Sequence, residues 1–161
     1  MIVRTGVGVD AHRLVESREM WMAGLFFADE SLGVEAHSDG DVAAHAICDA
    51  LLSAAHLGDL GEVFGTADPE WAGASGASLL TEVVGLIRRD GWEIANVAVQ
   101  ILGDHPRMSP RRREAEQVLG SILGAPVSVS ASSTDGLGFT GRSDGVMAIA
   151  SALLVADDHT D

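Results

Sequence analysis

The sequence predicts one α+β domain, a sheet of mixed strands covered on one face by helices. Its 161 residues, 47% of them apolar and 21% charged, suffice for a single domain with its own core. Segments of apolar alternation are interleaved with segments of helical periodicity, which is typical of helices packed over a sheet. No linker rich in Pro, Gly or Ser divides the chain. We therefore expect residues 1–161 to form one domain, with 157–161 as a flexible tail.

The N-terminal third is expected to contain two strands and a helix. Residues 2–10 are rich in Val and Gly and predict a strand. Residues 20–27 predict a second strand, separated from the first by the polar stretch 13–19. The first helix begins near Asp41, where several N-cap side chains are available, and Gly58 ends it.

The rest of the chain alternates between helices and strands. The elements expected are a helix over 79–89, a strand over 94–102, a helix over 110–122 and a strand over 126–132. Ser109 followed by Pro110 is a suitable N-cap and N1 pair for the helix over 110–122, and Arg111 to Arg113 are expected on its solvated face. Residues 146–155 form an apolar run whose periodicity does not decide between a helix and a buried strand.

The charge balance excludes several classes of partner. All ten basic residues are Arg, against 24 acidic residues, and the formal net charge is −14. This acidic field repels nucleic acids and anionic membrane surfaces and, by the same reasoning, phosphorylated metabolites. The chain has no leader pattern and no apolar run of the roughly 20 residues that a bilayer span needs. We expect a soluble, cytoplasmic protein in which the lone Cys48 is a buried apolar residue.

Asp10 and His12 stand at the end of the first predicted strand. Strand side chains alternate, so these two point to the same face. His45 lies in the first turn of the following helix and can supply a third ligand. Two His and one Asp are suited to a catalytic zinc site, which leaves a fourth position open. The alternative is that His45 is a packed or surface residue, because such spacings also occur by chance.

A second polar group follows the strand over 126–132. Residues 136–141 spell the glycine pattern of dinucleotide sites, but too little chain remains for the helix, strand and acidic residue of such a site. The side chains just before the glycines offer hard oxygen ligands that suit phosphate and magnesium, with a solvated turn as the alternative. These residues are Ser132, Ser133, Thr134 and Asp135. Arg142 after the glycines is expected to pair locally or to bind an anion.

Five motifs occur in order along the chain: G-x-D-x-H, HSDGDVxxH, DALLxAAxLGDxG, PxM and TDGLGFTGRxDG. Together they resemble the 2-C-methyl-D-erythritol 2,4-cyclodiphosphate synthase family of the non-mevalonate isoprenoid pathway, nearly end to end. The resemblance implies a single catalytic domain with a ferredoxin-like two-layer fold and a strand at 146–155. It also implies a homotrimer with one active site at each subunit interface.

The resemblance assigns roles to individual residues. It implies zinc at Asp10, His12 and His45, and magnesium or manganese at Asp135. Catalytic roles fall on Asp135, Thr134, His37 and Ser38, of which the last two lie near the substrate phosphate. The substrate-binding residues are Asp59 and Gly61 for the methylerythritol hydroxyls, Gly103, Pro106, Arg107, Met108, Ser109, Ala131, Ser132 and Ser133 on the cytosine side, and Phe139 and Arg142. An isoprenoid diphosphate on the trimer axis beside Arg142 is a further implied partner.

The implied reaction cyclises 4-diphosphocytidyl-2-C-methyl-D-erythritol 2-phosphate with release of CMP. The chain departs from the family pattern over residues 64–68 and 74–76. Arg107 replaces the usual Lys, and Asp135 and Asp144 replace Glu. Two other functions remain open: a zinc-dependent phosphoester hydrolase, and a non-catalytic trimer that binds isoprenoid diphosphates.

Overall fold

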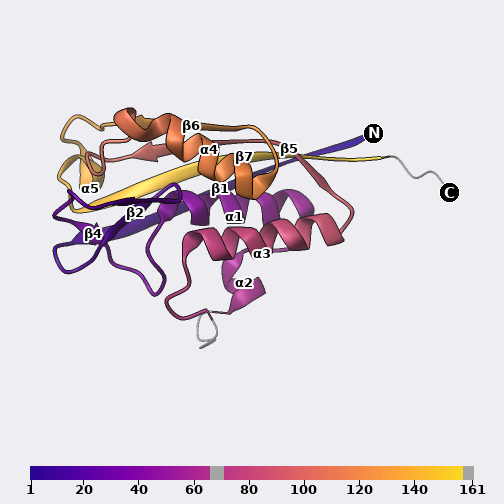
Figure 1. The fold of residues 1–161 in the computed structure, drawn as a ribbon, viewed down its shortest axis with the longest axis horizontal. Helices are drawn as coiled ribbons and strands as arrows, with labels where there is room; N and C mark the ends of the chain where they lie inside the picture. The colour runs from indigo at the N-terminus through magenta and orange to yellow at the C-terminus, as the bar shows by residue number, and fades with distance from the viewer. Residues whose placement is uncertain (66–70, 158–161) are drawn as a thin grey trace.

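The computed structural model describes residues 1–65 and 71–157, and Figure 1 shows the arrangement of its layers. The main sheet contains β1 (Ile2–Val15), β4 (Gly33–Val34), β5 (Glu93–Leu102), β6 (Val127–Ser132) and β7 (Gly145–Ala156), while β2 (Met20–Met22) and β3 (Leu25–Phe27) pair separately. The helices are α1 (Val42–Ala55), α2 (Leu60–Phe64), α3 (Gly76–Arg89), α4 (Arg112–Leu123) and α5 (Gly138–Gly141). The predictions made for residues 66–68 and 158–161 lie outside the described residues.

The main sheet is mixed, and helices cover one of its faces, as predicted (Figure 1). Its strand order is β4-β1-β7-β5-β6, in which β7 runs antiparallel to both β1 and β5. The predicted ferredoxin-like order is wrong in detail, because β1, α1, α3, β5, α4, β6 and β7 follow each other as β-α-α-β-α-β-β rather than β-α-β-β-α-β. The helix α4 connects β5 to β6, and a helical crossover of this kind joins strands that run parallel.

The first two predicted strands differ from the observed ones. Residues 20–27 form a hairpin instead of one strand, because Ala23 and Gly24 adopt φ values of 53° and 78° and reverse the chain. The first strand continues to Val15 through part of the stretch predicted to be polar loop. It does so because its last residues pair with β4 and β7, two partners that are distant in sequence.

Three other elements resolve or correct the predictions. Residues 146–155 lie in β7, between β1 and β5, which decides the ambiguity in favour of a buried strand. The helix α3 begins earlier than predicted, at Gly76, because the Ser75 hydroxyl accepts from Ser78 N–H at 3.0 Å. Ser109 does not cap α4: it begins a 3₁₀ turn, and the cap of this turn has no side-chain hydrogen bond.

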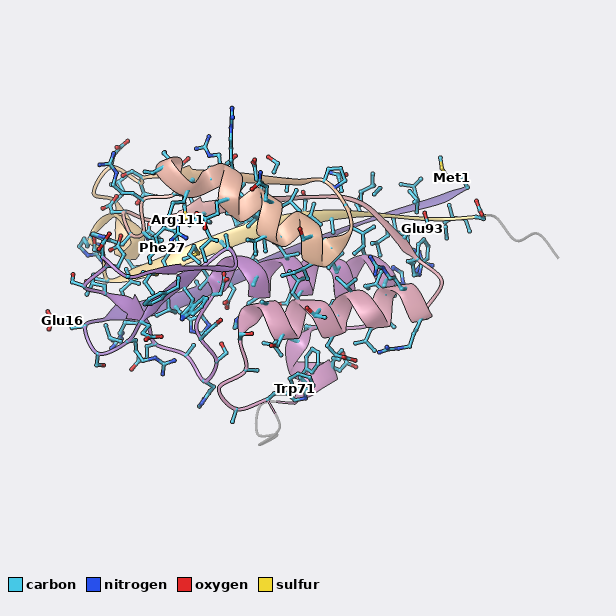
Figure 2. The ribbon with its side chains drawn as sticks, in the orientation of Figure 1. Met1, Glu16, Phe27, Trp71, Glu93 and Arg111 are labelled. Carbon is cyan, nitrogen blue, oxygen red and sulfur yellow. The ribbon has the colours of Figure 1, made fainter. Side chains whose placement is uncertain are left out.

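Arg111 is not the solvated residue predicted for the start of α4. Its guanidinium stacks 4.7 Å from the ring centre of Phe27 and donates to the Phe26 carbonyl and to Glu114. Figure 2 shows Arg111 beside Phe27. Arg111 therefore fastens the β2–β3 hairpin to α4, whereas Arg112 and Arg113 are exposed, as predicted.

The helix α1 lies unusually close to β1, and two glycines permit it. A Cβ atom on Gly6 would lie 2.1 Å from the Ala50 carbonyl oxygen, and one on Gly8 would lie 2.0 Å from that of Ala46. The buried face of α1 is built largely of alanines, and Cys48 lies among them, fully buried as predicted. Small side chains on both elements thus bring the α1 backbone against the strand that carries Asp10.

We predict that Gly8→Ala lowers the free energy of unfolding by about 2 kcal/mol, because the new methyl group meets a backbone carbonyl that only a shift of α1 can move. Urea denaturation measures the change. Gly85→Ala is the matched control, since its added Cβ meets only the flexible end of Arg89 at 3.2 Å. Equal stability of the two variants would contradict the close approach.

Candidate functional site

The three side chains predicted as metal ligands meet where β1 and α1 are closest. One potential ligand atom from each of Asp10, His12 and His45 lies within 4.8 Å of the other two. His12 Nε2 is 3.1 Å from Asp10 Oδ1, and His45 Nδ1 is 3.3 Å from Asp10 Oδ2. The prediction that these three residues converge is confirmed. The His45 side chain is also only 12% exposed, and its role as a metal ligand stays a prediction.

The contact of His12 Nδ1 with a main-chain carbonyl shows which ring nitrogen carries a hydrogen. His12 Nδ1 lies 3.0 Å from the Glu35 carbonyl oxygen, which can only accept, so Nδ1 carries the hydrogen. The Nε2 atom therefore faces the Asp10 carboxylate either with a second proton or with a lone pair directed at a cation. Carbonyl contacts of this kind orient metal-bound histidines. The sequence could not reveal Glu35, because its main chain makes the contact.

The Asp10 carboxylate supports a cation at this point. Asp10 Oδ2 is buried, and although His45 Nδ1 lies 3.3 Å away, it receives no well-directed hydrogen bond within the described residues. Two imidazole nitrogens and one carboxylate oxygen form a ligand set typical of zinc, with a fourth position left for substrate or water. The arrangement thus fits a divalent cation that would satisfy the buried oxygen.

The pKa shifts in the site favour a negative charge on Asp10 and a positive charge on His12 and His45. Although burial opposes its ionisation, His12 and His45 hold the pKa of Asp10 at about 2. The hydrogen bond to Asp10 raises the pKa of His12 above its usual 6.5. Burial lowers the pKa of His45, but the Asp10 carboxylate outweighs it and raises the pKa overall. The Asp10 carboxylate thus favours positive charge on both imidazoles, as it would favour a bound cation.

We predict that zinc affinity rises with pH. The histidines have raised pKa values, so zinc must displace protons from them until the pH exceeds those values, while Asp10 stays ionised throughout. Each displaced proton weakens apparent affinity about tenfold per pH unit below the pKa. Competition with a chromophoric chelator between about pH 6 and pH 8 measures the slope. An affinity independent of pH would show that these imidazoles are not the ligands.

Two neighbouring acids organise the site without facing it. Asp41 is 1% exposed and caps α1, accepting from Ala44 N–H at 3.0 Å and from the Ala23 and Gly24 N–H groups at 2.8 and 2.7 Å. Asp39 accepts from the Asp41 and Gly76 N–H groups. These carboxylates tie the β2–β3 turn and the start of α3 to the turn of helix that carries His45.

The residues predicted for the cytosine side gather around one pocket of about 350 Å³. Gly103 N–H donates to the Ser132 carbonyl at 3.1 Å, which joins the ends of β5 and β6. His105 Nδ1 lies 2.9 Å from Glu30 and anchors the loop. The pocket is lined by Gly103, Asp104, Pro106, Arg107, Met108, Ser109, Ala131, Ser132 and Ser133.

The segment after β6 is a tight turn that leaves its acid free. Asp135 is exposed with a φ of 51°, and its N–H donates to Ser133 Oγ at 3.0 Å. Thr134 Oγ1 donates to the Leu137 carbonyl and lies 2.8 Å from Thr140 Oγ1. Arg142 pairs with Asp144 at 3.0 Å, the local pairing that the sequence allowed. The Phe139 carbonyl accepts from Asp144 N–H at 2.9 Å, and Phe139 and Asp144 both line a pocket of about 660 Å³ that also borders His12.

The remaining predicted residues lie around α1 and α2. Asp59 caps α2 by accepting from Glu62 N–H at 2.8 Å, and Gly61 lies within that helix. The His37 carbonyl accepts from Gly73 N–H at 3.0 Å. Ser38 Oγ lies 3.2 Å from His45 Nε2, so Ser38 directly contacts one of the three predicted metal ligands.

Comparisons with known proteins agree with this geometry. The chain is 62% identical over 152 residues to a 2-C-methyl-D-erythritol 2,4-cyclodiphosphate synthase of Cutibacterium acnes, covering 94% of this chain and 90% of that protein. It is 53% identical to the synthase of Acidothermus cellulolyticus, covering 96% and 95%.

Solved structures show the same fold. The bifunctional IspDF of Campylobacter jejuni matches with a TM-score of 0.91 at 32% identity, over 99% of this chain and 44% of that one. A 2C-methyl-D-erythritol-2,4-cyclodiphosphate synthase with bound CDP matches with a TM-score of 0.86 at 34% identity, over 94% of this chain and all of that one. The YgbB family model matches residues 3–155. The chain therefore belongs to the YgbB family, to which its sequence motifs, its fold and its converging Asp and His side chains all point.

Proposed function

We propose that this chain converts 4-diphosphocytidyl-2-C-methyl-D-erythritol 2-phosphate to 2-C-methyl-D-erythritol 2,4-cyclodiphosphate and CMP. The observation that carries the proposal is the convergence of Asp10, His12 and His45 within 4.8 Å. Relatives at 62% and 53% identity are named 2-C-methyl-D-erythritol 2,4-cyclodiphosphate synthase, which supports the proposed product. The pocket beside Arg107 and Met108 is a suitable place for the cytidyl group.

The reaction requires positioning more than proton transfer. The attacking 2-phosphate is already an anion, so no strong general base is needed. The bond that forms joins a 2-phosphate oxygen to the β-phosphorus, and the bond that breaks releases CMP. The task of the protein is to bring mutually repelling phosphates together, in line, and to stabilise charge on their oxygens.

Named residues divide this task. Asp10, His12 and His45 would hold zinc, and Asp135 would hold magnesium or manganese; such ions, when bound, stabilise negative charge on phosphate oxygens. The exposed Asp135 carboxylate suits a cation that keeps water and phosphate oxygens as its other ligands. Arg107 places an exposed guanidinium at the rim of the cytidyl pocket. His37, Ser38 and Thr134 are proposed to orient the phosphates, and Asp59 with Gly61 the methylerythritol hydroxyls.

We also propose a homotrimer with an active site at each interface. Its support is the apolar surface on the sheet face that the helices leave uncovered, where Val7 is 61%, Val9 49%, Val3 48% and Ile149 37% exposed. Apolar side chains gathered in this way mark interaction surfaces. An isoprenoid diphosphate beside Arg142 and Phe139 is the ligand proposed for the trimer axis.

None of the helices in the described ranges is long and apolar enough to cross a membrane.

Incubation of the purified chain with the cytidyl substrate, zinc and magnesium tests the function. We expect phosphorus NMR to show the cyclic diphosphate appearing in step with CMP. Linear phosphate products would refute cyclisation and favour the zinc-dependent phosphoester hydrolase. No CMP release combined with tight binding of geranyl diphosphate would favour the non-catalytic binding trimer instead.

A further inference from the structure

A serine in the loop before α1 contacts His45 on the side of the ring that faces away from Asp10. Ser38 Oγ lies 3.2 Å from His45 Nε2, while His45 Nδ1 lies 3.3 Å from Asp10 Oδ2. The His45 side chain is only 12% exposed, and Ser38 is half-buried. The imidazole is therefore held between the acid of the metal cluster and one hydroxyl group.

The partners of the Ser38 hydroxyl group indicate the direction of its hydrogen bond with His45. A bound metal requires the lone pair of His45 Nδ1, which leaves the hydrogen on Nε2. Ser38 Oγ then accepts from His45 Nε2 and also from Gly40 N–H, which lies 3.2 Å away. Because both lone pairs are engaged, the Ser38 hydroxyl hydrogen is directed to a third group. A phosphate oxygen of the substrate is an acceptor of the right kind.

An arginine holds Ser38 from the other side. Arg18, in the loop between β1 and β2, donates to the Ser38 carbonyl oxygen at 2.6 Å. The backbone of Arg18 is itself packed against Gly33, where a Cβ atom would lie 2.2 Å from the Arg18 carbonyl oxygen. Gly33 begins the short strand that leads directly to Glu35, whose carbonyl contacts His12. Arg18 and the neighbouring strand β4 therefore support the contacts that Ser38 makes with His45 and that Glu35 makes with His12.

We propose that Ser38 is a positioning residue that sets the orientation and tautomer of His45 for metal binding, and that Arg18 positions Ser38. The inference rests on the proposed function in assigning a metal to the cluster, and it adds a link between metal affinity and phosphate recognition. A serine that served only to bind the phosphate would influence KM and leave metal affinity unchanged.

Zinc titration of the folded protein tests the role of Ser38 without substrate. We expect Ser38→Ala to weaken zinc binding about 10-fold to 100-fold, the range typical of lost outer contacts to metal-bound histidines. Ser38→Thr, which keeps the hydroxyl, should restore most of the affinity. The visible spectrum of the cobalt-loaded protein should change in Ser38→Ala only. Ser121→Ala, an exposed serine of α4, is the matched control. A zinc affinity of Ser38→Ala within twofold of this control would overturn the proposal.

A double-mutant cycle tests whether Arg18 acts through Ser38. Arg18→Ala should weaken zinc binding about threefold to tenfold in the wild-type background, the loss of one hydrogen bond. It should have less than about a twofold effect in the Ser38→Ala background. Equal effects in both backgrounds would overturn the role of Arg18. Normal zinc binding without CMP release would contradict the proposed function alone, so the two failures are distinguishable.

Discussion

His45→Ala is expected to lower the rate of CMP release by more than about 100-fold while the chain remains folded. The imidazole contributes one of three converging ligand atoms, and within the described residues the cluster contains only Asp10 and His12 besides it, so no fourth side chain is available to replace it. The substitution leaves a small, partly open space at the start of α1, because the ring is 12% exposed. The effect should therefore fall on metal content and turnover rather than on folding.

Three measurements check this result: CMP release, bound zinc by elemental analysis, and circular dichroism. His56→Asn is the matched control, because His56 ends the same helix with a φ of 61°, a conformation that asparagine tolerates. The control should retain zinc and activity. Release of CMP at equal rates by wild type and His45→Ala would refute the proposed function.

Asp41→Ala is expected to lower the free energy of unfolding by about 3 kcal/mol, more than any other single acid in this region. The change removes the N-cap of α1, which contributes about 1 kcal/mol. It also leaves the Ala23 and Gly24 N–H groups without their acceptor beside the core, at about 1 kcal/mol or more each. The β2–β3 turn and α1 would then lose their main polar connection.

Thermal unfolding measures the effect of Asp41→Ala, and a loss of this size corresponds to a fall of about 10 °C in Tm for a chain of this length. Asp41→Asn keeps an amide oxygen as acceptor and should lie between Asp41→Ala and wild type. The exposed Asp29 supplies the control, Asp29→Ala, which should match wild type. A Tm for Asp41→Ala equal to that of the control would contradict the structural role.

The acidic composition was misleading for one class of ligand. A net charge of −14 predicted repulsion of phosphorylated metabolites, yet the family relatives are named for a cyclodiphosphate product. The reason is that several acids are engaged locally. Asp10 lies between two imidazoles that attract a cation, and Asp41 is buried against backbone N–H groups. A bound cation would invert the local sign, whatever the sum over the surface.

Much of the fold was predictable because it depends on local chemistry. Alternating apolar residues predicted the strand over 94–102, and the observed β5 covers it. The conformation of ordered loops was harder to predict from the sequence. The turn at Ala23 lies within an apolar run, and its N–H donates to Asp41, a residue distant in sequence. The secondary structure of residues 146–155 depends on the strands that flank β7 on both sides, β1 and β5.

The sequence by itself determined the α+β class and the family motifs. Local rules of strand alternation and helix capping made Asp10, His12 and His45 candidate metal ligands, and the resemblance to the family selected them. Only the tertiary structure decided which ring nitrogen of each histidine faces Asp10, and that Glu35 and Ser38 contact the opposite nitrogens. Likewise, only the fold showed that Gly6 and Gly8 let α1 approach β1 closely enough for the cluster to form. These features depend on contacts between segments distant in sequence, often through main-chain atoms that are the same in every residue.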